Sequence, residues 1–124
     1  MKFDDKIPIY YQIKEYIYRQ MITGKLEPGE KMPAVRQLAV DLTVNVNTIQ
    51  RALSELVTEK MVESKRGRGN FVTEDTSKIK ELKDKLIMEQ LKQMYDGLQK
   101  LGVSDQEILD YVSRYVKEQE RDQK

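Results

Sequence analysis

Four polar side chains stand at helical spacing within NVNTIQRAL, residues 45–53 of this 124-residue chain: Asn47, Thr48, Gln50 and Arg51. Amides hydrogen-bond well to the edge of adenine and a guanidinium to the edge of guanine, while a hydroxyl can contact either base. The apolar residues of the same helix form a stripe on its other side: Ile49, Ala52, Leu53 and Leu56. The polar side chains are therefore expected to face outward, as in a helix that reads the DNA major groove, although each one alone also fits a solvated helix face.

The segment before this helix completes a helix-turn-helix. Residues 34–42 have apolar side chains at helical spacing and predict a short helix, which a brief break separates from the helix predicted at 46–59. Asn45 is the expected N-cap of the longer helix, onto the N–H near Thr48. Arg36 lies in the first turn of the short helix, where its guanidinium can reach a phosphate or the edge of a base, or can form an ordinary surface salt bridge.

A further helix is predicted near the start of the chain. Residues 8–23 lie between Pro8, which suits a first helical turn, and Gly24, which suits a helix end with positive φ. The apolar stripe of this helix is expected to contain Ile9, Ile13, Tyr16, Ile17 and Met21. The following segment, LEPGEKMP, carries two prolines and a glycine and predicts a loop or turn.

A basic β-hairpin is predicted after the helix-turn-helix. Residues 61–64 and 70–73 are short strand candidates around KRGRG, whose glycines can adopt unusual turn dihedrals. The tip residues are Lys65, Arg66, Gly67 and Arg68. A narrow positive tip suits insertion along a minor groove or a phosphate backbone, and the alternative is a solvated basic turn.

Composition limits the chemistry that the chain can perform. The sequence has no Cys and no His, which excludes disulfides, thiolate chemistry, imidazole metal ligands and a His general base. RGRGN lacks the spacing of a nucleotide-binding loop, which argues against phosphate transfer. Together with the missing His and Cys, this leads us to predict no enzyme activity, no cofactor and no metal. Residues 1–72 hold 12 Lys/Arg against 9 Asp/Glu, a net charge of +3, which indicates that a polyanion would meet this part of the chain.

The first residues mix charged and apolar side chains, and neither a signal peptide nor a membrane span is expected. A cytoplasmic protein without a membrane partner is predicted.

Residues 75–124 predict two helices with exposed apolar seams, separated at Gly102 and followed by a Ser104–Glu107 capping box. About fifty residues rarely fold alone without a disulfide or a metal, so we expect this tail to form a homodimer. The residues predicted to dimerise are Ile87, Leu91, Met94, Leu98, Leu101, Ile108, Val112 and Tyr115. The alternative is a tail that folds back onto its own chain.

The predicted fold is therefore mostly α with a small β-hairpin: a winged helix-turn-helix in residues 1–74, followed by a two-helix dimerisation hairpin in residues 75–124. Five collinear motifs in residues 7–73 resemble the N-terminal domain of the GntR family of bacterial transcription regulators: PIYYQI, GKLEPGEKMP, AVRQLA, NVNTIQRAL and GRGNFV. The short helical tail resembles that of the YtrA-type subfamily, whose members dimerise through it.

The resemblance implies which positions contact double-stranded DNA: Arg36, Asn45, Val46, Asn47, Thr48, Gln50, Arg66 and Gly67. Many relatives outside the subfamily carry Arg where this chain has Val46 and Gln50, which favours contact with thymine methyl groups and adenine over guanine. Ala34 replaces a common Ser and removes a helix cap.

The resemblance further implies a repressor that binds a palindromic operator near its own operon, with transporter genes among the candidates. The alternative is a winged-helix module that binds protein instead of specific DNA. A small-molecule effector is not identifiable from the residues. A crevice for one could include Met88, Met94 and Tyr95, although plain packing accounts for these three as well.

Overall fold

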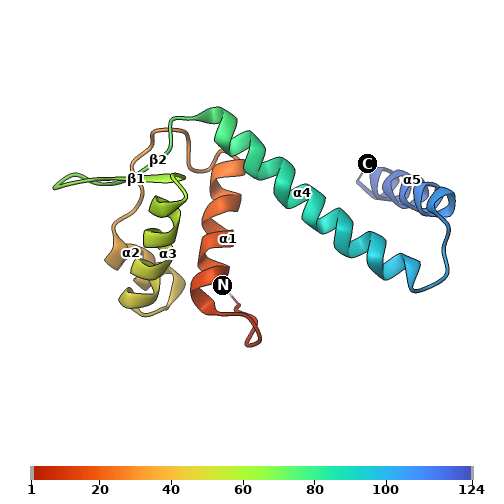
Figure 1. The fold of residues 1–124 in the computed structure, drawn as a ribbon, viewed down its shortest axis with the longest axis horizontal. Coiled ribbons are helices and arrows are strands. Elements are labelled where there is room, and N and C mark those ends of the chain that lie inside the picture. The colour runs from red at the N-terminus through yellow and green to blue at the C-terminus, as the bar shows by residue number, and fades with distance from the viewer. Residues whose placement is uncertain (1, 124) are drawn as a thin grey trace. The chain divides into compact units, whose positions relative to one another are not determined.

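The computed structural model describes residues 2–123, which contain five helices and one two-stranded antiparallel sheet (Figure 1). In chain order the elements are α1 (Ile9–Ile22), α2 (Val35–Leu42), α3 (Val46–Thr58), β1 (Val62–Lys65), β2 (Gly69–Val72), α4 (Thr76–Gln99) and α5 (Asp105–Asp122). The predicted fold, mostly helical with a small β-hairpin, is confirmed. The chain divides into two compact units, one up to Lys83 and one from Asp84 onward, and the predicted domain boundary at 74/75 stays a prediction.

The core of the first unit forms where α1 packs against α3. The whole predicted stripe of α3 is buried: Ile49, Ala52, Leu53 and Leu56. On α1 the buried residues are Ile13, Lys14, Ile17, Tyr18 and Met21. The prediction is wrong for Ile9, which is 44% exposed because it is the first residue of α1 and the buried face begins a turn later.

The connection between α2 and α3 is a tight turn at residues 43–45. Thr43 adopts a left-handed conformation, with φ 56° and ψ 52°. Asn45 caps α3 as predicted, although its side-chain oxygen accepts the N–H of Asn47 at 2.7 Å and not that of Thr48. Ala34 precedes α2 without a side-chain cap, also as predicted.

The hairpin strands each lie one residue nearer the turn than predicted, and they pair Ser64 with Asn70 and Lys65 with Gly69. Residues 30–32, predicted as loop, run along the free edge of β2: the N–H of Met32 donates to Asn70 O at 2.8 Å, and that of Val72 to Glu30 O at 2.9 Å. This pairing ties the hairpin to the chain that leads into α2. Two strands alone are marginally stable, so the added backbone bonds help to hold the hairpin in place.

The second unit contains α4 from Asp84 onward and α5. Gly102, with φ 75°, lies in their connection, and Ser104 and Glu107 form the predicted capping box. α4 ends at Gln99, so Leu101, predicted within this helix, lies in the connection, where its N–H donates to Leu98 O in a tightened last turn. No residue of α4 is buried, and on α5 only Ile108 is. Within residues 2–123 no helix is both long and apolar enough to cross a membrane.

Thr43→Asn is expected to stabilise the protein. A β-branched residue is strained in the left-handed region, whereas Asn tolerates it, so the free energy of unfolding should rise by about 0.5 to 1 kcal/mol. Urea denaturation measures this change. The reciprocal variant Gly24→Thr places a β-branched residue at φ 79° in open space and should lower the stability. An unchanged or lower stability of Thr43→Asn would show that the turn is not strained.

Candidate nucleic-acid interface

The outer face of α3 presents the predicted polar residues to solvent. Asn47, Gln50 and Arg51 are exposed, Thr48 is half-buried, and Val46 is 37% exposed at the start of the helix. Among residues 2–123, no hydrogen bond engages the side chains of Asn47, Thr48 or Gln50. Their donors and acceptors are therefore available to an external partner.

Arg51 differs from its neighbours because α1 holds its side chain. The guanidinium carbon lies 3.7 Å from the centre of the Tyr10 ring, and Nε lies 3.7 Å from Oε2 of Glu55. Stacking of this kind orients a guanidinium while leaving several N–H donors free. Because Tyr10 and Glu55 hold the Arg51 guanidinium in one orientation, it is better placed to contact a phosphate than to hydrogen-bond the edge of a base.

A polar cluster beneath this surface joins α1 to α3. Nζ of Lys14, on a side chain only 8% exposed, lies 3.0 Å from Oε1 of Glu55 and also bonds Glu59, which accepts a further hydrogen bond from the hydroxyl of Tyr18. Burial alone would lower the pKa of Lys14, but its bonds to Glu59 and Glu55 raise that pKa above its usual value. Burial and the bond to Glu59 raise the pKa of Tyr18. Lys14 therefore stays charged and Tyr18 neutral, which keeps the cluster intact near neutral pH.

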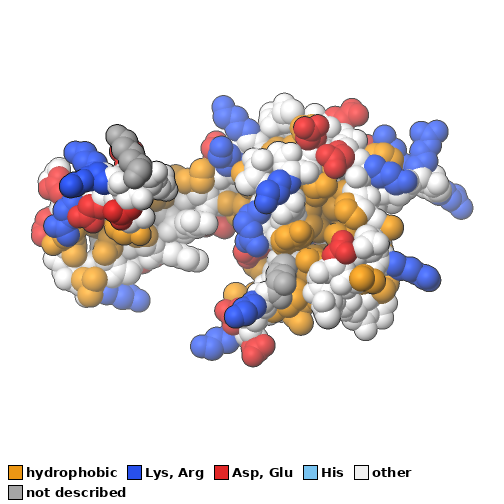
Figure 2. All heavy atoms as spheres, turned by 180° about the vertical axis from the view of Figure 1, so that it is seen from behind, with side chains coloured by type: hydrophobic (Ala, Val, Ile, Leu, Met, Phe, Trp, Pro, Cys, Tyr) orange, Lys and Arg blue, Asp and Glu red, His pale blue; other side chains and the backbone are white. Residues whose placement is uncertain are grey.

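The hairpin carries the predicted basic residues in two different settings. Arg66, Gly67 and Arg68 form the exposed turn, whereas Lys65 lies within β1 with Nζ 4.6 Å from the centre of the Phe71 ring. Figure 2 shows Lys and Arg side chains gathered on the hairpin, at the right of that view. The sequence prediction missed Lys31, whose Cε lies 3.1 Å from the point where a Cβ of Gly69 would stand. Lys31 lies beside the hairpin because residues 30–32 pair with β2, and the sequence pattern does not predict this pairing.

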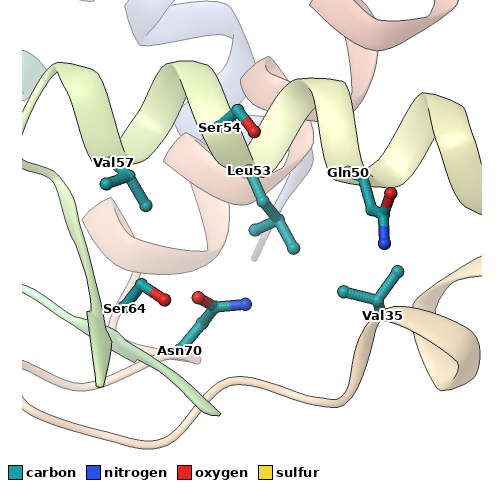
Figure 3. Close-up of a pocket in the computed structure, with 7 residues that line it drawn as sticks. All are labelled: Val35, Gln50, Leu53, Ser54, Val57, Ser64 and Asn70. Carbon is teal, nitrogen blue, oxygen red and sulfur yellow. The ribbon is translucent and has the colours of Figure 1, made fainter. Parts of the chain in front are cut away.

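A groove of about 450 Å³ separates α3 from the hairpin (Figure 3). It is lined by Val35, Gln50, Leu53, Ser54, Val57, Ser64 and Asn70. In Figure 3, Val35 and Gln50 lie across one end, Val57 and Ser64 lie across the other, and Leu53 and Asn70 lie between them. The start of α2, which carries the exposed Arg36, thus borders the same groove as α3 and the hairpin.

The predicted dimerisation residues are covered to different extents within one chain. Ile108 is buried, and Leu98 and Val112 are half-buried. The others are exposed: Ile87, Leu91, Met94, Leu101 and Tyr115. The predicted crevice residues Met88, Met94 and Tyr95 line an almost wholly apolar groove of about 390 Å³ between α4 and α5.

The fold and this polar surface define a winged helix-turn-helix protein of the DNA-binding class. The sequence profile described as "Bacterial regulatory proteins, gntR family" matches residues 9–72. The chain is 36% identical over 106 residues to the HTH-type transcriptional repressor YtrA of Bacillus subtilis (strain 168), covering 85% of this chain and 82% of YtrA. This protein therefore belongs to the GntR family and is a DNA-binding transcription regulator.

Solved structures agree with this assignment. A GntR family transcriptional regulator from Listeria monocytogenes superposes with a TM-score of 0.86 at 38% identity, covering 90% of this chain and 98% of that one. The DNA-binding domain of AraR in complex with operator ORX1 matches with a TM-score of 0.53 at 31% identity, covering 59% of this chain and 89% of that one. The first of these likenesses extends well into the helical tail, since 90% of the chain exceeds the winged helix alone.

Arg51→Ala is expected to weaken binding to all DNA duplexes by a similar factor. If the stacked guanidinium contacts a phosphate, its loss should reduce the slope of log K against log salt by about 0.9 without changing base preference. Fluorescence anisotropy across a salt series measures this slope. Arg114→Ala is a matched control, because Arg114 forms the same type of pair with Tyr111 and Glu118 in the tail. A changed base preference in Arg51→Ala would contradict the phosphate role.

Proposed function

We propose that this protein is a cytoplasmic homodimeric repressor that binds an inverted-repeat operator near its own operon, with one winged helix on each half-site. The observation that supports DNA reading is the start of α3, where the side chains of Asn47, Thr48 and Gln50 have no hydrogen-bond partner within residues 2–123. A two-fold protein requires a roughly palindromic site, because each subunit presents the same surface.

Base reading is assigned to the first turns of α3. Asn47, Thr48 and Gln50 supply hydrogen bonds, and the exposed methyl groups of Val46 suit a thymine methyl. Asn45 uses its side-chain oxygen to cap α3, which leaves its amide N–H groups for a phosphate. With an amide at position 50, the half-site is expected to be rich in A·T pairs.

Phosphate contact is assigned to residues at the edges of this surface. Arg36 lies at the start of α2, Arg51 is stacked on Tyr10, and Arg66 and Arg68 flank Gly67 in the exposed turn, with Lys65 beside them on β1. These cations would fix the register of the protein on the duplex, while the neutral residues of α3 choose the sequence.

Gln50→Ala is expected to weaken binding to the preferred duplex by about 1 to 3 kcal/mol and to relax preference at one base pair. Arg36→Ala should cause a loss of similar size. The measurement uses a duplex that the wild-type protein selects from a random pool, with each base pair then varied in turn. Wild-type affinity for this duplex should fall steeply with salt. An unchanged base preference in Gln50→Ala would show that Gln50 does not read a base. If the wild-type protein selects no duplex, the alternative of a protein-binding module would be favoured.

The exposed apolar side chains of α4 and α5 support the proposed dimer. α4 has no buried residue in a single chain, and large apolar side chains stay exposed along both helices, with Met88 at 63% and Leu91 at 45%. Helices of this kind depend on packing of an apolar face, and exposed apolar patches mark interaction surfaces. A second copy of the chain, placed on the groove between α4 and α5, would cover these side chains.

Leu91→Glu is expected to yield a monomer, because a carboxylate in an apolar seam is costly to bury. Sedimentation measures the mass, and anisotropy measures binding to a full inverted repeat and to a single half-site. The variant should lose its advantage on the full repeat and keep its half-site affinity. Gln90→Glu adds the same charge at a neighbouring exposed polar position and should stay dimeric. A dimeric Leu91→Glu, or a monomeric wild type, would contradict this assembly.

A further inference from the structure

The groove between α3 and the hairpin contains polar groups with no role inside the protein. Gln50, Ser54, Ser64 and Asn70 all line it, and none of their side chains takes part in a hydrogen bond within the described residues 2–123. The sheet register explains why two of them face this way: Ser64 and Asn70 are paired across the hairpin, so they share one face, whereas Lys65 and Phe71 are on the other. The groove thus gathers donors and acceptors on both walls.

The floor of the groove is apolar and its lining carries no charge. Val35, Leu53 and Val57 supply the apolar surface, and no carboxylate or cation is among the lining residues. A DNA strand has the matching chemistry, since it alternates apolar deoxyribose rings with phosphate oxygens that accept hydrogen bonds. The lack of carboxylates removes the repulsion that a phosphate would meet.

The position of this protein groove, between α3 and the hairpin, indicates which part of a DNA duplex would fit it. α3 on one wall is the element that enters the major groove, and the basic hairpin on the other suits the minor groove. The structure that separates these two grooves of DNA is a single sugar–phosphate strand. We propose that this strand lies in the groove between α3 and the hairpin, with Asn70, Ser64 and Ser54 as hydrogen-bond donors to its phosphates. The inference rests on the proposed mode of DNA binding and adds three contact residues to it.

The loss of an uncharged hydrogen-bond donor should weaken DNA binding in a different way from the loss of a cation. Asn70→Ala should weaken binding about tenfold, by the same factor on the selected duplex and on an unrelated one, because phosphate contacts carry no sequence information. The salt slope should stay unchanged, because no cation is lost. Arg66→Ala in the adjacent turn should instead reduce that slope by about 0.9. Ser113→Ala, at an exposed serine of α5 with no side-chain hydrogen bond in the described chain, should bind as the wild type does.

The experiment uses the full chain and a duplex that the wild type selects from a random pool. Single phosphates of this duplex are replaced, one at a time, by uncharged methylphosphonates. Wild-type affinity should fall at each phosphate that the protein contacts. At one or two adjacent phosphates the replacement should have little further effect on Asn70→Ala, whereas at the phosphates contacted by the arginines it should weaken Asn70→Ala as much as the wild type. Ser54→Ala tests the same groove from α3 without altering the sheet, and thermal unfolding checks that each variant folds.

Three results would overturn the proposal. Equal wild-type and Asn70→Ala affinities across the salt series, together with an unaltered Ser54→Ala, would show that the groove stays empty on DNA. A loss confined to the selected duplex would assign the groove to base reading. A wild-type protein that selects no duplex would overturn the proposed function as well, which distinguishes that failure from the first two.

Discussion

The packing of α3 on α1 is the contact on which the DNA-binding surface depends. Ile49, Ala52 and Leu56 are fully buried, so the core determines which side of α3 points outward. A rotation by one residue, about 100°, would bury Gln50 and expose Ile49. Two polar contacts reinforce the alignment: Lys14 with Glu55 beneath the helix, and Arg51 with Tyr10 at its side. The orientation of the side chains that we propose to read bases is thus a consequence of the core.

Hydrophobic periodicity predicts this core because burial is a property of whole helix faces. The stripe of α3, the cap at Asn45, the capping box at Ser104 and the presence of a hairpin around residues 65–69 all follow from local pattern. Contacts between segments that are distant in the sequence cannot be predicted from local pattern. A lysine within an apolar stripe gives no sign that Glu55 and Glu59 will neutralise it, and nothing local places residues 30–32 on the edge of β2. Candidate contacts at Lys31, Ser54, Ser64 and Asn70 emerge only once these segments are assembled.

Charged and uncharged polar side chains occupy different parts of the candidate interface. Cations lie at its margins, at Arg36, Arg51 and the hairpin turn, while the start of α3 and the adjoining groove offer amides, hydroxyls and methyl groups. In the proposed binding mode the marginal cations would supply the salt-dependent part of the affinity, and the neutral contacts would supply the discrimination between sequences. This distribution suits the proposed dimer, in which two half-site contacts would act together.

Dimethyl sulfate footprinting on the selected duplex reports contact in both grooves of DNA, because the reagent modifies guanine N7 in the major groove and adenine N3 in the minor groove. With α3 in one groove and the hairpin in the next, we expect protection in both grooves of each half-site, offset by about five base pairs, half a helical turn. The pattern should repeat with two-fold symmetry. Protection confined to one groove, or to one half of the duplex, would contradict it.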